Sequence, residues 1–192
     1  MLDLILGLSF LICSIPILVI LIPIIYFFID KSIFFTQERI GKHGLVFSIY
    51  KLKTMNDQTD GYGNLLPDME RTNRLGIWIR SWSLDEIPQL YNVIIGNMSI
   101  IGPRPLLVPY LHLYSEEQQK RHWVKPGITG LAQIKGRNSL DWKTSLKYDS
   151  WYANHYSLGV DLYILRQTIN IVLNRSNINA NPNETRSPFV GN

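Results

Sequence analysis

The pattern of apolar and polar positions divides the chain after its first thirty residues. Residues 4–29 hold no charged side chain, and a helix needs roughly 20 apolar residues to cross the hydrocarbon of a bilayer. No basic residue opens this run and no small-residue cleavage site follows it, so the run does not have the form of a cleaved signal peptide. The pattern therefore predicts an N-terminal membrane helix over residues 1–30.

Two prolines, Pro16 and Pro23, lie inside the apolar run. Each removes a backbone donor and collides with the preceding turn, so a bend is expected at one or both. The hydroxyl of Ser14 could bond a carbonyl that such a break leaves free, which would allow a helix-break-helix that enters the membrane and returns to the same face. Prolines are also common in spanning helices, and the residues by themselves favour a kinked spanning helix over this hairpin.

Basic residues gather on one side of the apolar run. The positive-inside rule therefore places the body of the chain in the cytoplasm. The formal net charge of the chain is +4, and the first thirty residues contain no Lys or Arg, so the body is basic and suits anionic partners such as phosphates, nucleotides, anionic lipid or nucleic acid. Cys13 is the only cysteine, which excludes an internal disulfide and a cysteine-rich metal site. The basic residues that follow the run are Lys31, Arg39, Lys42, Lys51 and Lys53.

The remaining pattern predicts one compact α+β domain, mainly helical, over residues 31–175. Two β-rich runs between residues 33 and 55 flank a turn signal at 41–44 and indicate a small β-hairpin. A polar loop follows at 56–68. Few apolar residues remain at the end of the chain, so residues 176–192 are predicted to form a mobile tail.

Helical spacing recurs in three segments of the body. The first combines Trp and Arg residues, as helices at a membrane interface do, although a Trp on a helix is more often core. The last is apolar apart from Arg166 and Gln167 and also suits an amphipathic interfacial helix. These helices are expected at residues 71–82, 111–123 and 160–173.

Lys51 and Lys53 end the second run of the hairpin. Residues two apart in a strand point to the same face, where both amines could meet an anionic ligand or a lipid surface. A solvated strand face explains the two lysines equally well.

Adjacent carboxylates at Asp85 and Glu86 are the main candidates for chemistry. If Asp85 caps a helix, Pro88 falls at its third position, where no donor is needed; with Ser83 as the cap, the proline would damage the first turn. A helix start would hold the carboxylate of Asp85 ionised and ready to attack or to bind metal. An ordinary acidic cap is the plain alternative, but Arg104 follows in a Gly-Pro-Arg-Pro run and suits a phosphate ligand.

Several motifs in one order resemble a known family. They are "FTQERIG", "YKLKTM", "RSWSLDEIPQLYNVIIGNMSIIGPRPLL", "RHWVKPGITGLAQIKGRN" and "YDSWYA". Together they are similar to the bacterial monotopic phosphoglycosyl transferases in their small, PglC-like form, from the apolar leader to about Arg175.

The resemblance implies a reaction and its partners. The enzyme would transfer a sugar 1-phosphate from a UDP-sugar to polyprenyl (undecaprenyl) phosphate and release UMP, as the first membrane step of glycoconjugate or polysaccharide biosynthesis. It would lie monotopically in membrane lipid on the cytoplasmic face of the bacterial inner membrane, with downstream glycosyltransferases as further partners and no nucleic acid. The leader would be a re-entrant helix broken at Ser14 and Pro16 in place of a span, although Ile15, not serine, precedes the proline here.

The resemblance also assigns roles to residues. Asp85 would be the nucleophile that carries the phosphosugar and a ligand of Mg²⁺, and Glu86 would assist proton transfer or metal placement. Arg104 and Arg137 are the expected phosphate contacts. Further candidates for phosphate binding are Arg80, Lys51 and Lys53.

Two other classes of function fit parts of the sequence. A membrane-attached basic module that binds lipid or nucleic acid would need no carboxylate pair, and no RNA- or DNA-binding motif is present. A membrane phosphatase would share the acyl-phosphate chemistry and use water as acceptor. The four histidines have no metal-ligand spacing: His43, His112, His122 and His155.

Overall fold

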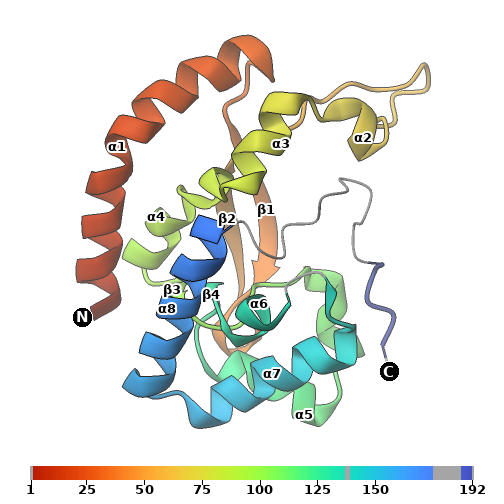
Figure 1. The fold of residues 1–192 in the computed structure, drawn as a ribbon. Coiled ribbons are helices and arrows are strands. Elements are labelled where there is room, and N and C mark those ends of the chain that lie inside the picture. The colour runs from red at the N-terminus through yellow and green to blue at the C-terminus, as the bar shows by residue number, and fades with distance from the viewer. Residues whose placement is uncertain (1, 137–138, 175–186, 192) are drawn as a thin grey trace.

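The computed structural model describes residues 2–136, 139–174 and 187–191. They form a mainly helical domain around two small sheets, with a long N-terminal helix along one side (Figure 1). The α-helices are α1 (Leu2–Phe28), α2 (Asp68–Arg71), α3 (Arg74–Ser81), α4 (Gln89–Ile94), α5 (Glu116–Gln119), α6 (Leu131–Lys135), α7 (Trp142–His155) and α8 (Leu158–Asn174). The strands are β1 (Phe34–Ile40), β2 (Val46–Leu52), β3 (Ser99–Ile101) and β4 (Gly127–Thr129). Short 3-10 helices are η1 (Lys42–Gly44), η2 (Leu84–Glu86), η3 (Val108–Leu113) and η4 (Lys120–Trp123).

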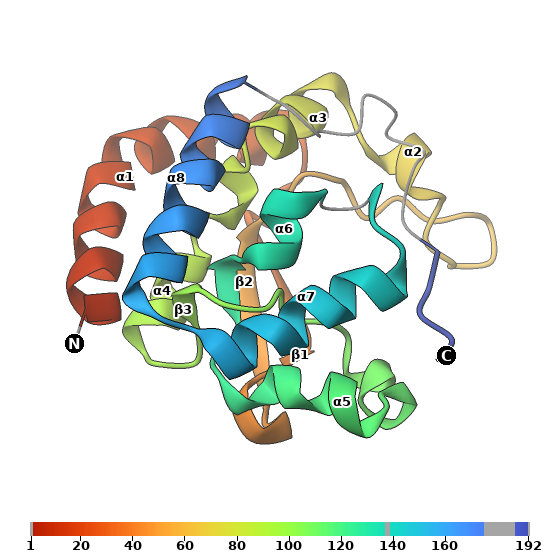
Figure 2. The same ribbon diagram turned by 60° about the horizontal axis from the view of Figure 1, so that its bottom comes forward.

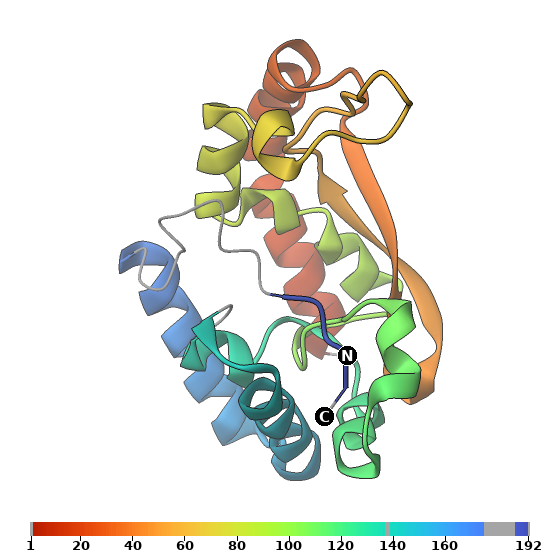
Figure 3. The ribbon, with the colours of Figure 1, turned by 90° about the vertical axis from the view of Figure 1, so that its right-hand side faces the viewer.

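The predicted hairpin is confirmed. β1 and β2 pair antiparallel from Phe34 opposite Leu52 to Ile40 opposite Val46, with η1 at the tip. The hairpin forms the long twisted ribbon at the edge of the domain in Figure 3. A second, parallel pair joins β3 to β4, and the sequence pattern gave no sign of it because each of these strands has only three residues.

The apolar leader is a bent helix and not two helices around a break. α1 is continuous from Leu2 to Phe28 with Pro16 and Pro23 inside it, and its axis turns in its upper half (Figure 1). Its length and composition suffice to cross a membrane. The Ser14 hydroxyl donates to the Leu11 carbonyl at 2.7 Å, whereas the carbonyl that Pro16 leaves without a helical donor belongs to residue 12.

Both ends of α1 are hydrogen-bonded to the domain. Near the start, an Asp3 carboxylate oxygen accepts from the Ser99 hydroxyl at 2.8 Å and from the Ile100 amide at 3.1 Å. At the other end, the Asn73 side chain donates to the Phe28 carbonyl at 2.7 Å. The first half of the helix packs against α4 and β3, and its second half packs against β2 and α3, so α1 lies against the domain along its length.

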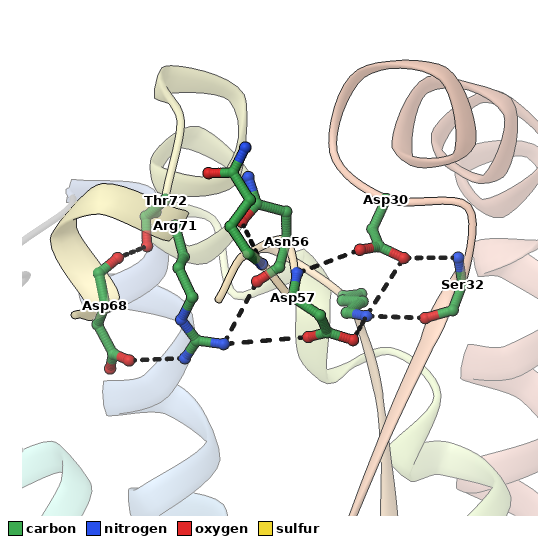
Figure 4. Close-up of polar contacts among 9 residues, drawn as sticks. Asp30, Ser32, Asn56, Asp57, Asp68, Arg71 and Thr72 are labelled. Atoms are coloured by element: carbon green, nitrogen blue, oxygen red, sulfur yellow. Dashed lines mark hydrogen bonds and ion pairs between the residues drawn. The ribbon is translucent and has the colours of Figure 1, made fainter. Parts of the chain in front are cut away.

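A chain of charges links the end of α1 to the loop after β2 (Figure 4). Lys53 pairs with Asp30 at 3.2 Å and with Asp57, and it donates to the Ser32 hydroxyl at 2.8 Å. Arg71 then joins Asp57 to α2: its guanidinium lies 3.9 Å from the Asp57 carboxylate and 2.9 Å from that of Asp68. Lys53 is thus occupied by structural ion pairs near the end of α1.

α3 approaches the backbone after β2 so closely that only glycine fits at position 76. A Cβ on Gly76 would lie 2.0 Å from the Thr54 carbonyl oxygen. Gly76→Ala is therefore expected to lower the free energy of unfolding by about 1–3 kcal/mol, because overpacking outweighs the helix propensity gained. Urea unfolding in a fixed detergent checks this. Gly159→Ala in α8 is the matched control, since nothing lies within 4 Å of its added Cβ; equal stability of the two variants would contradict the close packing.

The other predicted helices are confirmed only in part. The segment 71–82 is divided between α2 and α3, and α8 contains the predicted 160–173. The single helix expected at 111–123 is wrong: the chain forms η3, α5 and η4, because a capping box at Ser115 and Gln118 starts a new helix after two extended residues.

The end of the chain returns to the domain. Phe189 is 3 % exposed and packs against the rings of Tyr110, Tyr114 and Trp142. The indole of Trp142 also donates to the Ser187 carbonyl at 2.8 Å. Of the predicted tail, residues 176–186 lie outside the described part of the chain, while residues 187–191 lie against α7 and η3.

Candidate active site

The two carboxylates lie in a tight turn between α3 and α4. Ser83 has a left-handed backbone (φ 54°), and the chain then makes the 3-10 turn η2, which contains Asp85 and Glu86. Asp85 is therefore not a helix cap, and that prediction is wrong: α4 begins only at Gln89, after Pro88. A left-handed non-glycine residue costs free energy, so the strained turn beside the acids fits a functional site.

Lys51 bridges the two carboxylates. Its amine lies 3.2 Å from Asp85 Oδ2 and 2.8 Å from Glu86 Oε1. Arg104 approaches from the other side, with Nη2 at 3.1 Å from the same Glu86 oxygen. The residues come from β2, η2 and the loop after β3, and together they place the buried Asp85 and the partly buried Glu86 beside two cations.

The environment separates the two acids electrostatically. Asp85 is 8 % exposed, and burial raises the pKa of its carboxyl against the opposing charge of Lys51. Burial would also raise the pKa of Glu86, but Lys51 and Arg104 outweigh it and hold that pKa at about 2. The Glu86 carboxylate in turn raises the pKa of Arg104. Glu86 is thus firmly ionised, while burial opposes the ionisation of Asp85.

Buried polar groups hold this arrangement in place. Asn92 in α4 donates from its side chain to the Ser48 carbonyl at 2.8 Å and accepts from the Tyr50 amide at 3.2 Å, which ties α4 to the strand that carries Lys51. Arg121 donates to the Arg104 carbonyl at 2.6 Å and pairs with Asp149 at 2.8 Å. Arg121 is 2 % exposed and Asp149 is 3 % exposed, so the backbone of Arg104 rests on a buried ion pair.

The structure sorts the predicted phosphate ligands. It places Lys51 and Arg104 at the acids. Lys53 pairs with Asp30 and Asp57 instead, because the end of α1 and the loop after β2 bring these two carboxylates to its amine. Arg80 donates to the Thr54 hydroxyl at 2.7 Å. Arg137 lies outside the described residues.

Arg39 is a candidate ligand that the sequence reasoning missed. Burial and then the nearby charge of Arg104 lower its pKa to about 10. Two guanidinium groups that repel each other beside an acidic pair form a place where an anion would relieve the repulsion. The available signal was its position in "FTQERIG", five residues after the start of β1 and opposite Phe47 in the hairpin.

The acidic pair fits a magnesium ion. Mg²⁺ binds through one or two carboxylates together with substrate phosphates and waters, and Asp85 and Glu86 supply two adjacent carboxylates of which Glu86 is firmly ionised. In the described part of the chain, no third carboxylate, histidine or cysteine joins them. The amine of Lys51 contacts one oxygen of each carboxylate.

His122 gives the domain a pH-dependent stability. Its ring is buried, with Nδ1 at 3.2 Å from the Gly41 carbonyl oxygen, and burial followed by the charge of Arg121 lowers its pKa from 6.5 to about 4. The unfolded chain takes up the proton first as pH falls, so the contribution of His122 is complete above pH 6.5 and is lost toward pH 4. The free energy of unfolding should therefore decrease as the pH is lowered from 6.5 to about 4.

The test compares two variants in urea unfolding over this pH range. His122→Gln should remove part of the slope. The control, His155→Gln, replaces an exposed histidine at the end of α7 and should leave the slope unchanged. An unchanged slope in His122→Gln would assign the pH dependence to other groups.

Comparisons with known proteins show the family of the chain. The family model described as bacterial sugar transferase matches residues 1–175. The sugar transferase EpsL of Bacillus subtilis is 44% identical over 189 residues, which cover 98% of this chain and 94% of EpsL. The undecaprenyl-phosphate galactose phosphotransferase of Salmonella typhimurium is 37% identical over 155 residues, which cover 72% of this chain and 33% of that protein. An N-acetylgalactosaminephosphotransferase of Aeromonas hydrophila is 35% identical over 150 residues, 73% of this chain and 35% of that protein.

Lys51 and Arg104 flank the adjacent acids Asp85 and Glu86, and the same chain carries an apolar helix long enough to cross a membrane. The chain belongs to the bacterial sugar transferase family. It is a phosphoglycosyl transferase, and the family resemblance of its sequence motifs is confirmed.

Proposed function

We propose that the enzyme transfers a sugar 1-phosphate from a UDP-sugar to undecaprenyl phosphate or a similar polyprenyl phosphate, releasing UMP, in the assembly of a bacterial polysaccharide or glycoconjugate. Relatives named for undecaprenyl-phosphate galactose and N-acetylgalactosamine transfer support the acceptor and the sugar phosphate. Relatives named for exopolysaccharide production support the pathway class. The observation that carries the proposal is the buried Asp85 carboxylate beside an ionised Glu86 and two cations.

The reaction proceeds in two displacements on Asp85. An oxygen of the Asp85 carboxylate attacks the β-phosphorus of the UDP-sugar, and the bond from that phosphorus to the bridging oxygen breaks, so UMP leaves with the electron pair. The sugar phosphate is then held on Asp85 as an acyl phosphate. An oxygen of the lipid phosphate attacks the same phosphorus and releases the carboxylate, which gives the lipid diphosphosugar.

The surrounding charges support this division of roles. Poor solvation makes the Asp85 carboxylate a better nucleophile than one in water, and Lys51 holds it by a single contact at 3.2 Å. Glu86, with a pKa of about 2, is too weak a base for efficient proton transfer near neutral pH. We therefore assign Glu86 to orienting Lys51 and Arg104 and to holding Mg²⁺ with Asp85. When bound, Mg²⁺ would offset the charge of the diphosphate. Arg104 and Arg39 would contact the oxygens of the diphosphate.

Product analysis tests the proposal. The purified enzyme is given a panel of UDP-sugars, Mg²⁺ and undecaprenyl phosphate in detergent, and UMP and lipid products are measured. A lipid diphosphosugar together with stoichiometric UMP is expected. Free sugar phosphate without a lipid product would indicate a phosphatase, and no turnover with any UDP-sugar would favour a membrane-attached lipid-binding module.

We also propose that α1 is re-entrant, with the domain on the cytoplasmic face of the inner membrane. The bonds of Asp3 to β3 and of Phe28 to Asn73 support this, because both ends of α1 would have to lie on the side of the bilayer where the domain is. The bend in α1 and the exposed Trp78 on α3 agree with a shallow insertion.

Cysteine labelling tests this topology in a Cys13→Ser background. A cysteine placed at Leu2 and one placed at Lys143 in α7 should both be protected from a membrane-impermeant maleimide in intact cells and react after lysis. Labelling of the Leu2 site from outside, with the Lys143 site protected, would show a spanning helix instead.

A further inference from the structure

A cavity of the molecule lies apart from the acidic pair. It has a volume of about 440 Å³ and opens between α6, α7 and α8, which gather on one side of the domain (Figure 2). α6 contacts both of the longer helices, α7 and α8. Its lining residues are Leu131, Lys135, Lys147, Tyr148, Trp151, Gly159, Val160 and Tyr163.

The lining combines an apolar wall with two amines. None of these eight residues is acidic, whereas Lys135 and Lys147 are exposed. The Lys135 amine donates to the Tyr163 hydroxyl at 3.4 Å and lies 5.7 Å from the centre of that ring. Tyrosine and tryptophan side chains, which combine an apolar ring with a polar group, are typical of the membrane interface, where lipid head groups meet acyl chains. The charge of the site therefore complements an anion, and its wall complements a hydrocarbon.

The surface beside the cavity is apolar as well. α8 turns Leu158, Leu162, Ile169 and Leu173 outward, each more than half exposed. Their spacing of four, seven and four residues places them on one stripe of the helix. The opposite face buries Ile164 and Ile171 in the domain. A ligand that enters between α7 and α8 would thus find a second apolar surface outside the cavity.

We propose that this cavity binds one anionic membrane phospholipid, with phosphatidylglycerol as the probe. The phosphate would lie between the amines of Lys135 and Lys147. The parts of the acyl chains next to the head group would lie against Leu131, Tyr148 and Val160. The cavity has the size of a ligand pocket but holds only part of a phospholipid, so the rest of the chains would lie along the outward stripe of α8. The site stands apart from the proposed reaction, since it needs neither Asp85 nor a sugar donor.

Native mass spectrometry of the full-length enzyme tests the proposal. The protein is taken from nanodiscs that contain equal amounts of phosphatidylglycerol and phosphatidylcholine, and the retained lipid is counted. One phosphatidylglycerol per chain is expected, in clear excess over phosphatidylcholine. The double variant Lys135→Gln/Lys147→Gln should reduce this retention about 30-fold, because each interfacial lysine contributes about a factor of five to anionic-lipid binding.

Two further variants separate a site from a general charge effect. The control double variant, Lys42→Gln/Lys143→Gln, removes the same charge from residues outside the cavity lining and should retain the lipid. Gly159→Phe should abolish retention by filling the cavity: its added Cβ meets no atom within 4 Å, so the fold, monitored by circular dichroism, should be kept.

Three results of the lipid-retention measurements would overturn the proposal. They are equal retention of phosphatidylcholine, equal loss of phosphatidylglycerol in the control double variant, and undiminished retention in a folded Gly159→Phe. The reaction's own lipid is tested separately: if undecaprenyl phosphate at a small mole fraction displaces phosphatidylglycerol from the wild type, the cavity belongs to the acceptor, and the phospholipid assignment is wrong.

Discussion

Asp85→Asn is expected to reduce turnover by about 10³-fold or more while the enzyme still folds and still associates with the membrane. An amide has the shape of the carboxylate but is a far poorer nucleophile, so the first displacement would stop. Intact-protein mass spectrometry checks the intermediate directly. Wild-type enzyme given a UDP-sugar and Mg²⁺ without lipid acceptor should gain the mass of one sugar phosphate, and Asp85→Asn should not.

The control for this experiment is Asp68→Asn, which makes the same change in α2, where Asp68 pairs with Arg71. It should carry the adduct and keep its turnover. If the wild type shows no adduct, or if Asp85→Asn carries the same adduct, the reaction is a direct displacement or uses another nucleophile. The transferase assignment itself would survive that result, because it depends on the products formed.

Lys51→Met should lower kcat by about 10²-fold or more and shift the acidic limb of the pH–rate profile upward. Lys51 is the largest opposing charge at Asp85 and at Glu86. Without it, burial would raise the pKa of both acids, so the ionised forms needed for attack and for phosphate orientation would be lost at a higher pH. Initial rates of UMP release across pH 4–9, measured on the folded protein, would show the shift.

Lys53→Met is the matched control, because it removes the same side chain two residues further along. Lys53 pairs with Asp30 and Asp57, away from the acidic pair. Its loss should reduce stability and leave the pH–rate profile in place. If both variants shift the profile equally, the effect comes from the positive charge of the whole region and not from the bridge to Asp85 and Glu86.

The sequence by itself determined the local features of this protein. The uncharged run at 4–29 predicts a membrane helix because hydrocarbon contact depends only on the composition and length of the segment. The turn signal at 41–44 fixed the hairpin, since the loop of a hairpin also sets its register. The adjacent acids Asp85 and Glu86 and the following Arg104 were recognisable as chemistry from residue type and proximity, and Glu86 and Arg104 do meet.

Backbone geometry decided where α4 begins, which the residue preferences at helix starts did not predict. Pro88 fitted a helix capped by Asp85, yet the left-handed Ser83 and the 3-10 turn shift the start of α4 to Gln89. In the same way, the prediction that Lys51 and Lys53 share a face assumed that the strand continues. β2 ends at Leu52, and the carboxylates of Asp30 and Asp57, from the end of α1 and the loop after β2, hold the Lys53 amine away from the acidic pair.

Only the tertiary structure decided which distant residues complete the site. Lys51 reaches Asp85 across 34 positions of sequence, and Arg121 supports Arg104 through a buried pair with Asp149. No pattern of spacing encodes such contacts, because they depend on how Asn92 fixes α4 to β2 and how β3 pairs with β4. The residue types for phosphate chemistry were present in the sequence, but burial and long-range pairing determined which lysine lies at the acids and which one holds the end of α1.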